Sequence, residues 1–155
     1  MGAAAENTRR GLFIVRLPGD EWAGSRCGSL MYNIDLSATV YDLAGITPPS
    51  EIHGQSVLPL LREKAGWHDR EYVTCRYADS VCYIDDETWA IGDIDGNLLE
   101  IFDLNTDPDC MKPLGESEAE GRWKLAWDRL LSDAGGEFPD YRGLPKTDAL
   151  GRSLE

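Results

Sequence analysis

Four short apolar runs, separated by turn residues, constrain the fold of this chain more than any other feature. The connections between them are two to four residues long and read ADS, DE and IDGN. Runs joined this closely form consecutive antiparallel hairpins, because a parallel return needs a crossover of roughly a dozen residues or more. The sequence therefore predicts a four-stranded antiparallel meander. Its strands are expected at residues 71–77, 81–85, 88–93 and 98–104.

A helix is predicted before this meander. Residues 33–44 carry apolar side chains at helical spacing, with Asn33 as the expected N-cap and Asp35 in the first turn, where the helix dipole favours a negative charge. Gly45 is expected to end the helix in the left-handed conformation that glycine adopts without strain. The stripe expected to face the core consists of Ile34, Leu36, Val40, Leu43 and Ala44.

A second helix is predicted after the meander. Ser117 and Glu120 form an S-x-x-E pattern, which is typical of a capping box at a helix start. Gly135-Gly136 is expected to end this helix. One face is apolar and is expected to pack on the sheet. That face consists of Trp123, Ala126, Trp127, Leu130, Leu131 and Ala134.

Two shorter elements complete the prediction. Residues 12–18, LFIVRLP, form an apolar run that indicates a buried strand. Residues 53–63 indicate a short helix capped by Ser56. Pro59 falls in the first turn of that helix, where backbone N–H groups have no partner within the helix, so proline's lack of an N–H costs no hydrogen bond.

The order of these elements predicts an α+β fold: a four-stranded antiparallel meander with helices packed on one face, plus an N-terminal strand and helix. A length of 155 residues suits one domain, which we place at residues 11–135. Residues 1–10 are expected to be a disordered tail and residues 136–155 a loop or tail, because both are poor in apolar periodicity.

The acidic composition limits the partners of this chain. It has 15 basic and 28 acidic residues and a formal net charge of −13. A charge of this sign repels nucleic acid and anionic membranes, because both are bound through basic side chains. No apolar run approaches the ~20 residues of a membrane helix, and the first residues lack the apolar segment of a secretory signal. We therefore expect a cytoplasmic protein that binds neither nucleic acid nor membrane.

Two acidic turns superficially resemble calcium loops. Asp93–Asn97 and Asp103–Asp107 place a carboxylate or an amide at every second position. A calcium-binding loop needs glycine at its sixth position and a bidentate glutamate at its twelfth, and neither turn has them. Hairpin tips favour aspartate and asparagine for conformational reasons alone. The sequence therefore assigns no metal ligand.

The histidines and cysteines form no recognisable site. His53 or His68 could serve as a general base, but no activated nucleophile such as G-x-S-x-G accompanies them. The four cysteines form no C-x-x-C pair, so zinc is not indicated. Cys75 and Cys82 would lie opposite each other across a two-residue turn and on opposite faces across a longer one. We assign no catalytic residue and no cofactor.

The tryptophans supply the last candidates. Trp123 and Trp127 lie one helical turn apart on the stripe expected to face the core, so packing explains them. Trp22 and Trp67 fall in predicted loops and could form a platform for a sugar ring. A sugar-binding or small-ligand module is therefore one hypothesis for function.

Four segments, taken in order, resemble the C-terminal portion of the sulfatases, a family of the alkaline phosphatase superfamily. They are LFIVRLPG, YNIDLSATVYDLAGITPP, IHGQSVLPLL and LLEIFDLNTDPD, and they span roughly residues 10–133. The chain departs from the family at Ala38, where the family usually has proline, and at Cys110, where it usually has glutamate. The resembling positions are Ile34-Asp35-Leu36, Thr39, Leu43-Ala44-Gly45, Pro49, Gly54, Ser56 to Leu61, Phe102-Asp103-Leu104 and Asp107-Pro108.

The resemblance implies sulfate ester hydrolysis for the family, but it transfers no reacting group to this chain. A sulfatase uses a formylglycine made from Cys or Ser in a C-x-P-x-R or S-x-P-x-R motif, and a divalent metal held by Asp, Asn and His. These groups lie upstream of the resembling part, and no cysteine of this chain stands in such a motif. No catalytic, cofactor or metal residue is therefore carried over.

Two further hypotheses follow from the resemblance. The first is a free-standing sulfatase C-terminal module, a scaffold or oligomerisation domain without its own catalytic machinery. Its first strand and the apolar side of helix 33–44 would need a cover, so we expect a homodimer formed through residues 12–44. The alternative is a non-catalytic fragment or subunit of a sulfuric ester hydrolase whose active site is on another polypeptide. On either hypothesis this chain alone is not expected to be an enzyme.

Overall fold

The computed structural model describes residues 13–16, 19, 23–48, 51–62 and 66–140. The chain divides into two compact units, Met1–Val73 and Thr74–Glu155. The domain predicted for residues 11–135 extends over both units, and its bounds stay a prediction.

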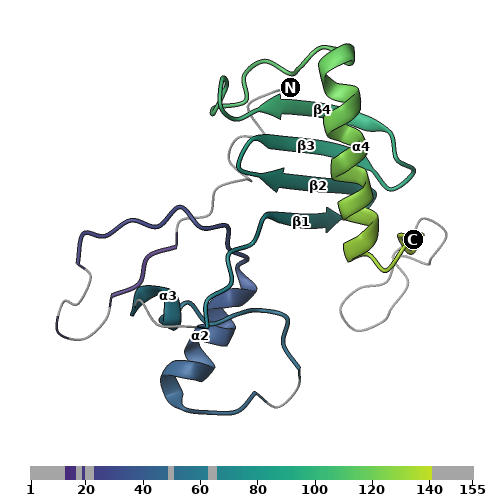
Figure 1. Cartoon of the computed structure of the whole chain (residues 1–155). Coiled ribbons are helices and arrows are strands. Elements are labelled where there is room, and N and C mark those ends of the chain that lie inside the picture. Colours follow the sequence, from purple (N-terminus) through teal and green to yellow (C-terminus); the bar gives the residue numbers. More distant parts are fainter. Residues whose placement is uncertain (1–12, 17–18, 20–22, 49–50, 63–65, 141–155) are drawn as a thin grey trace, which may run out of the picture. The chain divides into compact units, whose positions relative to one another are not determined.

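The sheet forms the predicted meander (Figure 1). Neighbouring strands follow one another in the order β1-β2-β3-β4, and both β2 with β3 and β3 with β4 pair antiparallel. The short connections leave no room for a crossover, which is why sequence order and sheet order coincide. The α+β class is therefore confirmed. The strands are β1 (Tyr72–Tyr77), β2 (Ser80–Asp85), β3 (Thr88–Asp93) and β4 (Leu98–Asp103).

Cross-strand register determines which residues enter the core. Tyr83 of β2 pairs with Ala90 of β3, which pairs with Ile101 of β4, and all three are buried. On the other face Trp89 stacks on Phe102 with ring centroids 5.1 Å apart. Because alternate residues point to opposite faces, both faces of the central strands carry buried apolar side chains.

The turn between β1 and β2 has two residues, Ala78 and Asp79. This is the shorter of the two turns considered for Cys75 and Cys82, and it favours the register that places them opposite each other. Among the described cysteines, Cys75 is exposed and Cys82 half-buried, and neither forms a disulfide.

Ala78 has a φ of 53°, in the left-handed region. We expect Ala78→Gly to raise the free energy of unfolding of the second unit by about 0.5–1 kcal/mol, because relief of roughly 1–2 kcal/mol of strain exceeds the added chain entropy of glycine. Chemical denaturation measures this change. Ala134→Gly is the matched control: Ala134 has a φ of −78°, so glycine there should lower stability. A loss at both positions would contradict the explanation.

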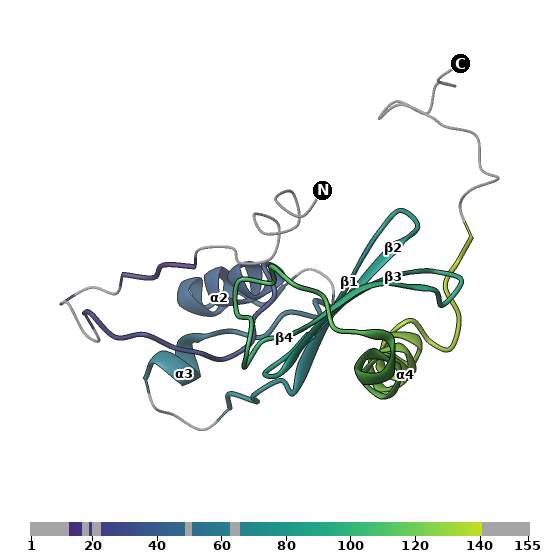
Figure 2. The same ribbon diagram turned by 90° about the horizontal axis from the view of Figure 1, so that it is seen from above.

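Helix α4 (Glu116–Asp133) lies across one face of the sheet, as seen from above in Figure 2. Ala126 and Leu130 of the predicted stripe are buried there, and so is Ala119, which lies outside that stripe. The predicted capping box is wrong, because the helix begins before Ser117 and its N-cap, Gly115, makes no side-chain bond. Two glutamates in the first turn favour this earlier start through the helix dipole.

The end of α4 agrees with the prediction. The N–H of Gly135 donates to the carbonyl oxygen of Ser132 at 3.2 Å, and the N–H of Gly136 donates to that of Leu131 at 2.8 Å. This pair of bonds is a Schellman motif, which requires the positive φ of 82° found at Gly135.

Two arginines hold α4 on the sheet. Arg129 donates to the hydroxyl of Tyr83, which itself donates to Asp85 Oδ2 at 2.7 Å. Burial, and then the hydrogen bond to Asp85, raise the pKa of Tyr83 above its usual range, so the phenol stays protonated. Arg122 Nη2 donates to Asp103 Oδ2 at 2.9 Å. The helix is thus placed by apolar packing and by directional bonds near both of its ends.

The first unit contains α2 (Ile34–Ala44) and α3 (Leu58–Leu61), which contact each other. The predicted end of α2 is confirmed: Gly45 has a φ of 64° and its N–H donates to the carbonyl oxygen of Asp42. Pro59 lies in the first turn of α3, as expected. None of the helices in the described ranges is both long and apolar enough to cross a membrane.

The start of α3 differs slightly from the prediction. Val57 occupies the N-cap position and makes no side-chain cap. Ser56, one residue earlier, still satisfies a helical donor, because its hydroxyl accepts the N–H of Leu58 at 3.2 Å. The same hydroxyl donates to Asp42 Oδ2 at 2.5 Å, which joins α3 to α2.

The strand predicted for residues 12–18 is wrong for the part that the structure describes. Residues 13–16 form no strand, and Ile14 is 77% exposed. A strand needs a hydrogen-bonding neighbour, and the described strands pair with one another instead. Residues 12, 17 and 18 lie outside the described ranges.

The orientation predicted for α2 is also wrong. Leu36, Val40 and Leu43 are 52%, 55% and 51% exposed, whereas Asp35 and Thr39 are buried. Asn33, at the N-cap position, makes no capping bond with its side chain. Periodicity locates the helix correctly, but a polar cluster rather than the apolar stripe determines which side faces inward.

Candidate functional site

Asp35 is the centre of this polar cluster in the first unit. Its carboxylate is fully buried. Oδ1 accepts the N–H of Gln55 at 2.9 Å and Nη2 of Arg70 at 2.8 Å, and Oδ2 accepts the N–H of Tyr32 and Nη1 of Arg70, each at 2.8 Å. A buried carboxylate is tolerated only when it is paired and hydrogen-bonded in this way. Asp35 thus joins the start of α2 to two distant segments of the chain.

Arg70 is held by contacts on several sides. Its Nη1 also donates to the carbonyl oxygen of Leu30 at 3.3 Å, and its guanidinium carbon lies 5.0 Å from the ring centre of Tyr32 and 5.9 Å from that of Trp67. A planar guanidinium can bind a carboxylate with two bonds and stack on a ring at once, which lysine cannot do. No sequence pattern indicates this pair, because Asp35 and Arg70 are far apart along the chain.

Trp67 is one of the two tryptophans considered as a sugar platform. Its indole N–H donates to Asp69 Oδ1 at 2.7 Å, and the hydroxyl of Ser29 donates to the same oxygen at 2.8 Å. The hydrogen bond from Trp67, then that from Ser29, lowers the pKa of Asp69 below the ordinary 3.8. Trp67 therefore has a structural role next to Arg70. Trp22 lies outside the described residues.

The contribution of Asp69 to stability is expected to disappear in acid. Its pKa is lower in the folded chain than in the unfolded chain, so the contribution is complete above about pH 4 and is lost as the pH falls through the folded pKa. An NMR titration of the Asp69 carboxyl should give a midpoint below 3.8. Trp67→Phe removes the main donor and should move the midpoint upward; the same midpoint in both proteins would refute this assignment.

His53 and His68 are both exposed. The side chain of Gln55 binds the backbone of His68: Nε2 donates to its carbonyl oxygen at 2.8 Å and Oε1 accepts its N–H at 3.4 Å. These bonds hold the loop around residue 68. The absence of a catalytic role for the two histidines stays a prediction.

The acidic turns use their carboxylates within the backbone. Asp93 Oδ1 accepts the N–H groups of Asp95 and Asn97, and Oδ2 accepts the side-chain amide of Asn97. The bonds from Asn97 lower the pKa of Asp93 below 3.8. Over the part of the chain that the structure describes, no group of three or more His, Cys, Asp or Glu side chains could hold a metal ion.

Gly54 lets the loop approach α2. A Cβ atom added there would lie 2.8 Å from the carbonyl carbon of Ile34 and 3.1 Å from the nitrogen of Asp35. Backbone atoms cannot move aside as a side chain can, so only glycine permits this approach. The approach brings the N–H of Gln55 to Asp35, and the cluster depends on it.

Leu36, Val40 and Leu43 form what we term the α2 face. They lie at i, i+4 and i+7, on one side of the helix, and each is more than half exposed. The buried side of α2 is held by polar bonds: Thr39 Oγ1 donates to the carbonyl oxygen of Asp35 at 2.6 Å and accepts the N–H of Val57 at 3.0 Å. These polar bonds leave the α2 face exposed, and this apolar surface is the candidate functional site.

Most of this chain is similar to a known protein family. Residues 4–130 match the family described as N-sulphoglucosamine sulphohydrolase, C-terminal. An uncharacterized protein of Haemophilus influenzae is 31% identical over 91 residues, which are 56% of this chain and 46% of that protein. An N-acetylglucosamine-6-O-sulfatase of Bacteroides thetaiotaomicron is 34% identical over 71 residues, 43% of this chain and 13% of that enzyme.

A solved structure is also similar to this chain. The structure of BT1596, a 2-O GAG sulfatase, has 27% sequence identity to this chain and a TM-score of 0.50, over 72% of this chain and 26% of that one. The chain therefore spans less than half the length of each of these relatives.

Proposed function

Because the chain belongs to the N-sulphoglucosamine sulphohydrolase C-terminal family, we propose that it is the non-catalytic C-terminal part of a sulfuric ester hydrolase. In this role it docks through the α2 face on a catalytic part that supplies the nucleophile. The catalytic part either precedes these residues in a longer polypeptide or is a separate chain.

The exposed α2 face is the observation that carries this proposal. Three large apolar side chains are about half exposed on a helix whose opposite side is held by a buried ion pair. Covering the exposed half of each would contribute about 0.8–1.5 kcal/mol, half of the value for full burial, which favours an interface. The portion similar to this chain makes up 26% of the BT1596 chain, so that relative has a further part on which such a surface could dock.

The names of the relatives suggest the substrate class. One is a 6-O-sulfatase of N-acetylglucosamine and another is a 2-O GAG sulfatase. We therefore expect the complete enzyme to remove sulfate from a sugar. The divalent metal that such an enzyme uses does not fit the described residues of this chain, which offer no cluster of suitable ligands. Metal and nucleophile are accordingly assigned to the catalytic part.

A scaffold that dimerises through residues 12–44 is the second candidate. Ile14 is among the most exposed apolar residues, and it adds to the apolar surface of that segment. Two copies that bury the same surface would form a symmetric interface, in which each α2 face covers the other. This candidate requires no catalytic part.

Co-expression separates the two candidates. The chain is produced alone, and also together with a sulfatase catalytic part that carries C-x-P-x-R and is encoded in the same genome. We expect a one-to-one complex that hydrolyses an aryl sulfate, and no turnover by the chain alone. A stable dimer that does not bind the catalytic part would favour the scaffold. Turnover by the isolated chain would overturn both candidates.

A further inference from the structure

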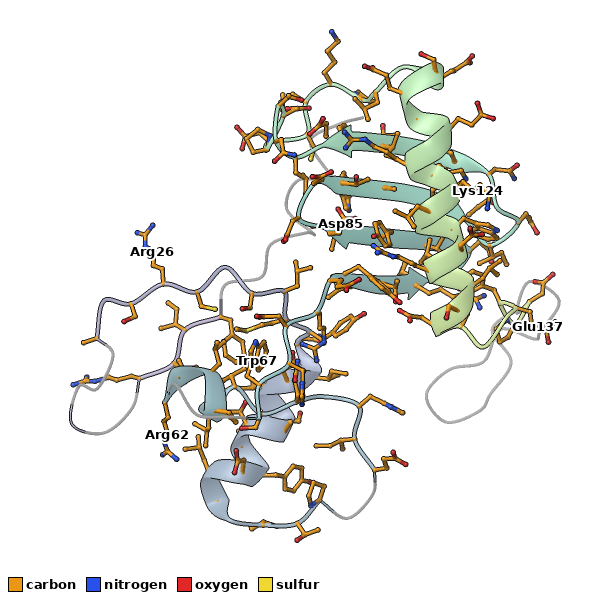
Figure 3. The ribbon with its side chains drawn as sticks, viewed as in Figure 1. Arg26, Arg62, Trp67, Asp85, Lys124 and Glu137 are labelled. Carbon is orange, nitrogen blue, oxygen red and sulfur yellow. The ribbon has the colours of Figure 1, made fainter. Side chains whose placement is uncertain are left out.

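A groove of about 550 Å³ runs along α4 in the second unit. This volume lies within the roughly 300–1,000 Å³ that is usual for small-molecule sites. Its position is marked by Lys124 in Figure 3. The groove is lined by Ser117, Glu120, Gly121, Trp123, Lys124 and Trp127.

The two tryptophans in this groove are held in fixed positions. Their ring centroids are 5.7 Å apart and their planes are tilted by 38°. Trp123 Nε1 donates to the carbonyl oxygen of Gly96 at 3.0 Å, and the ring of Trp127 lies 5.6 Å from that of Phe138. Rings that are already immobilised lose little rotamer freedom when a ligand binds. Both are half-buried and line the groove.

The strands leave space for these rings at two glycines. A Cβ atom at Gly92 would lie 2.6 Å from Cζ2 of Trp123, and one at Gly96 would lie 3.2 Å from Cζ2 of Trp127. The indoles therefore rest on the backbone of β3 and of the turn that follows it. Their positions are set by the sheet and do not depend on a ligand.

Gly121 lines the groove and lies inside an 18-residue helix, where glycine costs about 1 kcal/mol relative to alanine. A Cβ atom at Gly121 would meet nothing within 4 Å, so packing does not require glycine at this position. A larger side chain there would occupy part of the groove.

The lining groups indicate the chemistry of the ligand. Indole faces accept the C–H face of a pyranose ring, and the hydroxyl of Ser117, the carboxylate of Glu120 and the ammonium of Lys124 can bind its hydroxyls. Lys124 is already paired with Asp128 at 2.7 Å. With Glu120 also present and a net charge of −13, the groove opposes sulfated or carboxylated sugars.

We propose that this groove binds an uncharged pyranose unit of a saccharide. Trp123 and Trp127 form the platform, and Glu120 and Lys124 orient the hydroxyls. The site belongs to the second unit alone, so it does not depend on docking through the α2 face. Beside a sulfatase catalytic part it would hold an unsulfated stretch of a sugar chain.

Isothermal titration calorimetry tests the proposal with tri-N-acetylchitotriose and with its 6-O-sulfated form. We expect saturable binding of the neutral trisaccharide and at least about tenfold weaker binding of the sulfated one. Gly121→Leu places a side chain in the groove, its Cβ meets nothing within 4 Å, and leucine favours the helix, so it should weaken binding by about tenfold or more while circular dichroism stays unchanged. Glu118→Leu, an exposed position of α4 outside the groove, is the matched control and should bind as the original chain does.

Three results would overturn the proposal. The first is the absence of saturable binding of the neutral trisaccharide. The second is equal binding by the Gly121→Leu and Glu118→Leu variants. The third is tighter binding of the sulfated form, which would contradict the assigned ligand class. Unfolding of the second unit is not the expected cause of weaker binding by the Gly121→Leu variant, because this variant is expected to be at least as stable as the original chain.

Discussion

Replacement of Asp35 by alanine is expected to destabilise the first unit by about 3–5 kcal/mol. The change leaves the guanidinium of Arg70 without its carboxylate and removes the acceptor for the N–H groups of Tyr32 and Gln55. Hydrogen exchange measures the effect directly, since the amides of Tyr32 and Gln55 should lose protection. Amides of β3, in the second unit, should keep theirs.

Two further variants show whether the ion pair is the cause. Asp109→Ala removes an exposed carboxylate and should change stability by about 0.5 kcal/mol or less. Asp35→Leu combined with Arg70→Met removes both charges and should recover much of the loss, because apolar replacements of a buried pair avoid the unpaired charge. If Asp35→Ala costs no more than Asp109→Ala, the cluster does not hold α2.

A double substitution on the α2 face, Leu36→Asp with Leu43→Asp, is expected to weaken docking on the catalytic part by about tenfold or more. Covering the exposed half of each leucine contributes about 0.8–1.5 kcal/mol, and about 1.4 kcal/mol corresponds to a factor of ten in affinity. The stability of the chain alone should change little, because both side chains are more than half exposed. Analytical ultracentrifugation of the mixed components measures the loss of the complex.

Leu99→Asp is the matched control for this experiment, because Leu99 is 59% exposed on β4, in the other unit. It should leave docking intact. If the chain instead forms a homodimer through residues 12–44, the double variant should yield monomers without any catalytic part present. Equal docking by the double variant and by the Leu99→Asp control would exclude the α2 face from the interface.

Local patterns predicted most of the elements correctly. Short connections specified the meander, the glycines after α2 and α4 mark their ends, and the motifs resembling sulfatases identified the family that residues 4–130 match. Caps were predicted less well, since neither Asn33 nor Ser117 acts as expected. A cap depends on where the preceding chain runs, and the pattern S-x-x-E contains no information on that path.

Sequence patterns predicted the fold better than they predicted the candidate sites. Trp123 and Trp127 pack against the backbone of the sheet and its turn, as helical spacing predicts, but they are only half-buried and also line a groove. Spacing identifies the side of a helix that carries aromatic rings, but it does not show how completely the neighbouring strands cover them. Likewise, apolar residues in α2 were expected to face inward, and the α2 face is exposed.

The sequence by itself determined the order and approximate limits of the four strands of the meander and of α2, α3 and α4, but not the absence of a strand at residues 13–16. Periodicity, turn residues and glycine caps act over a few neighbouring residues. It also determined the family, through motifs spread along most of the chain. Only the tertiary structure decided which side of α2 is buried. That choice depends on Asp35, Arg70 and Gln55 meeting across long stretches of chain, and on Gly54 allowing the backbones to approach. The carboxylate of Asp35 accepts four hydrogen bonds there, and breaking such a buried pair costs about 3–5 kcal/mol. The apolar side chains on the opposite side of α2 are only about half exposed, so this orientation leaves only part of their surface in water.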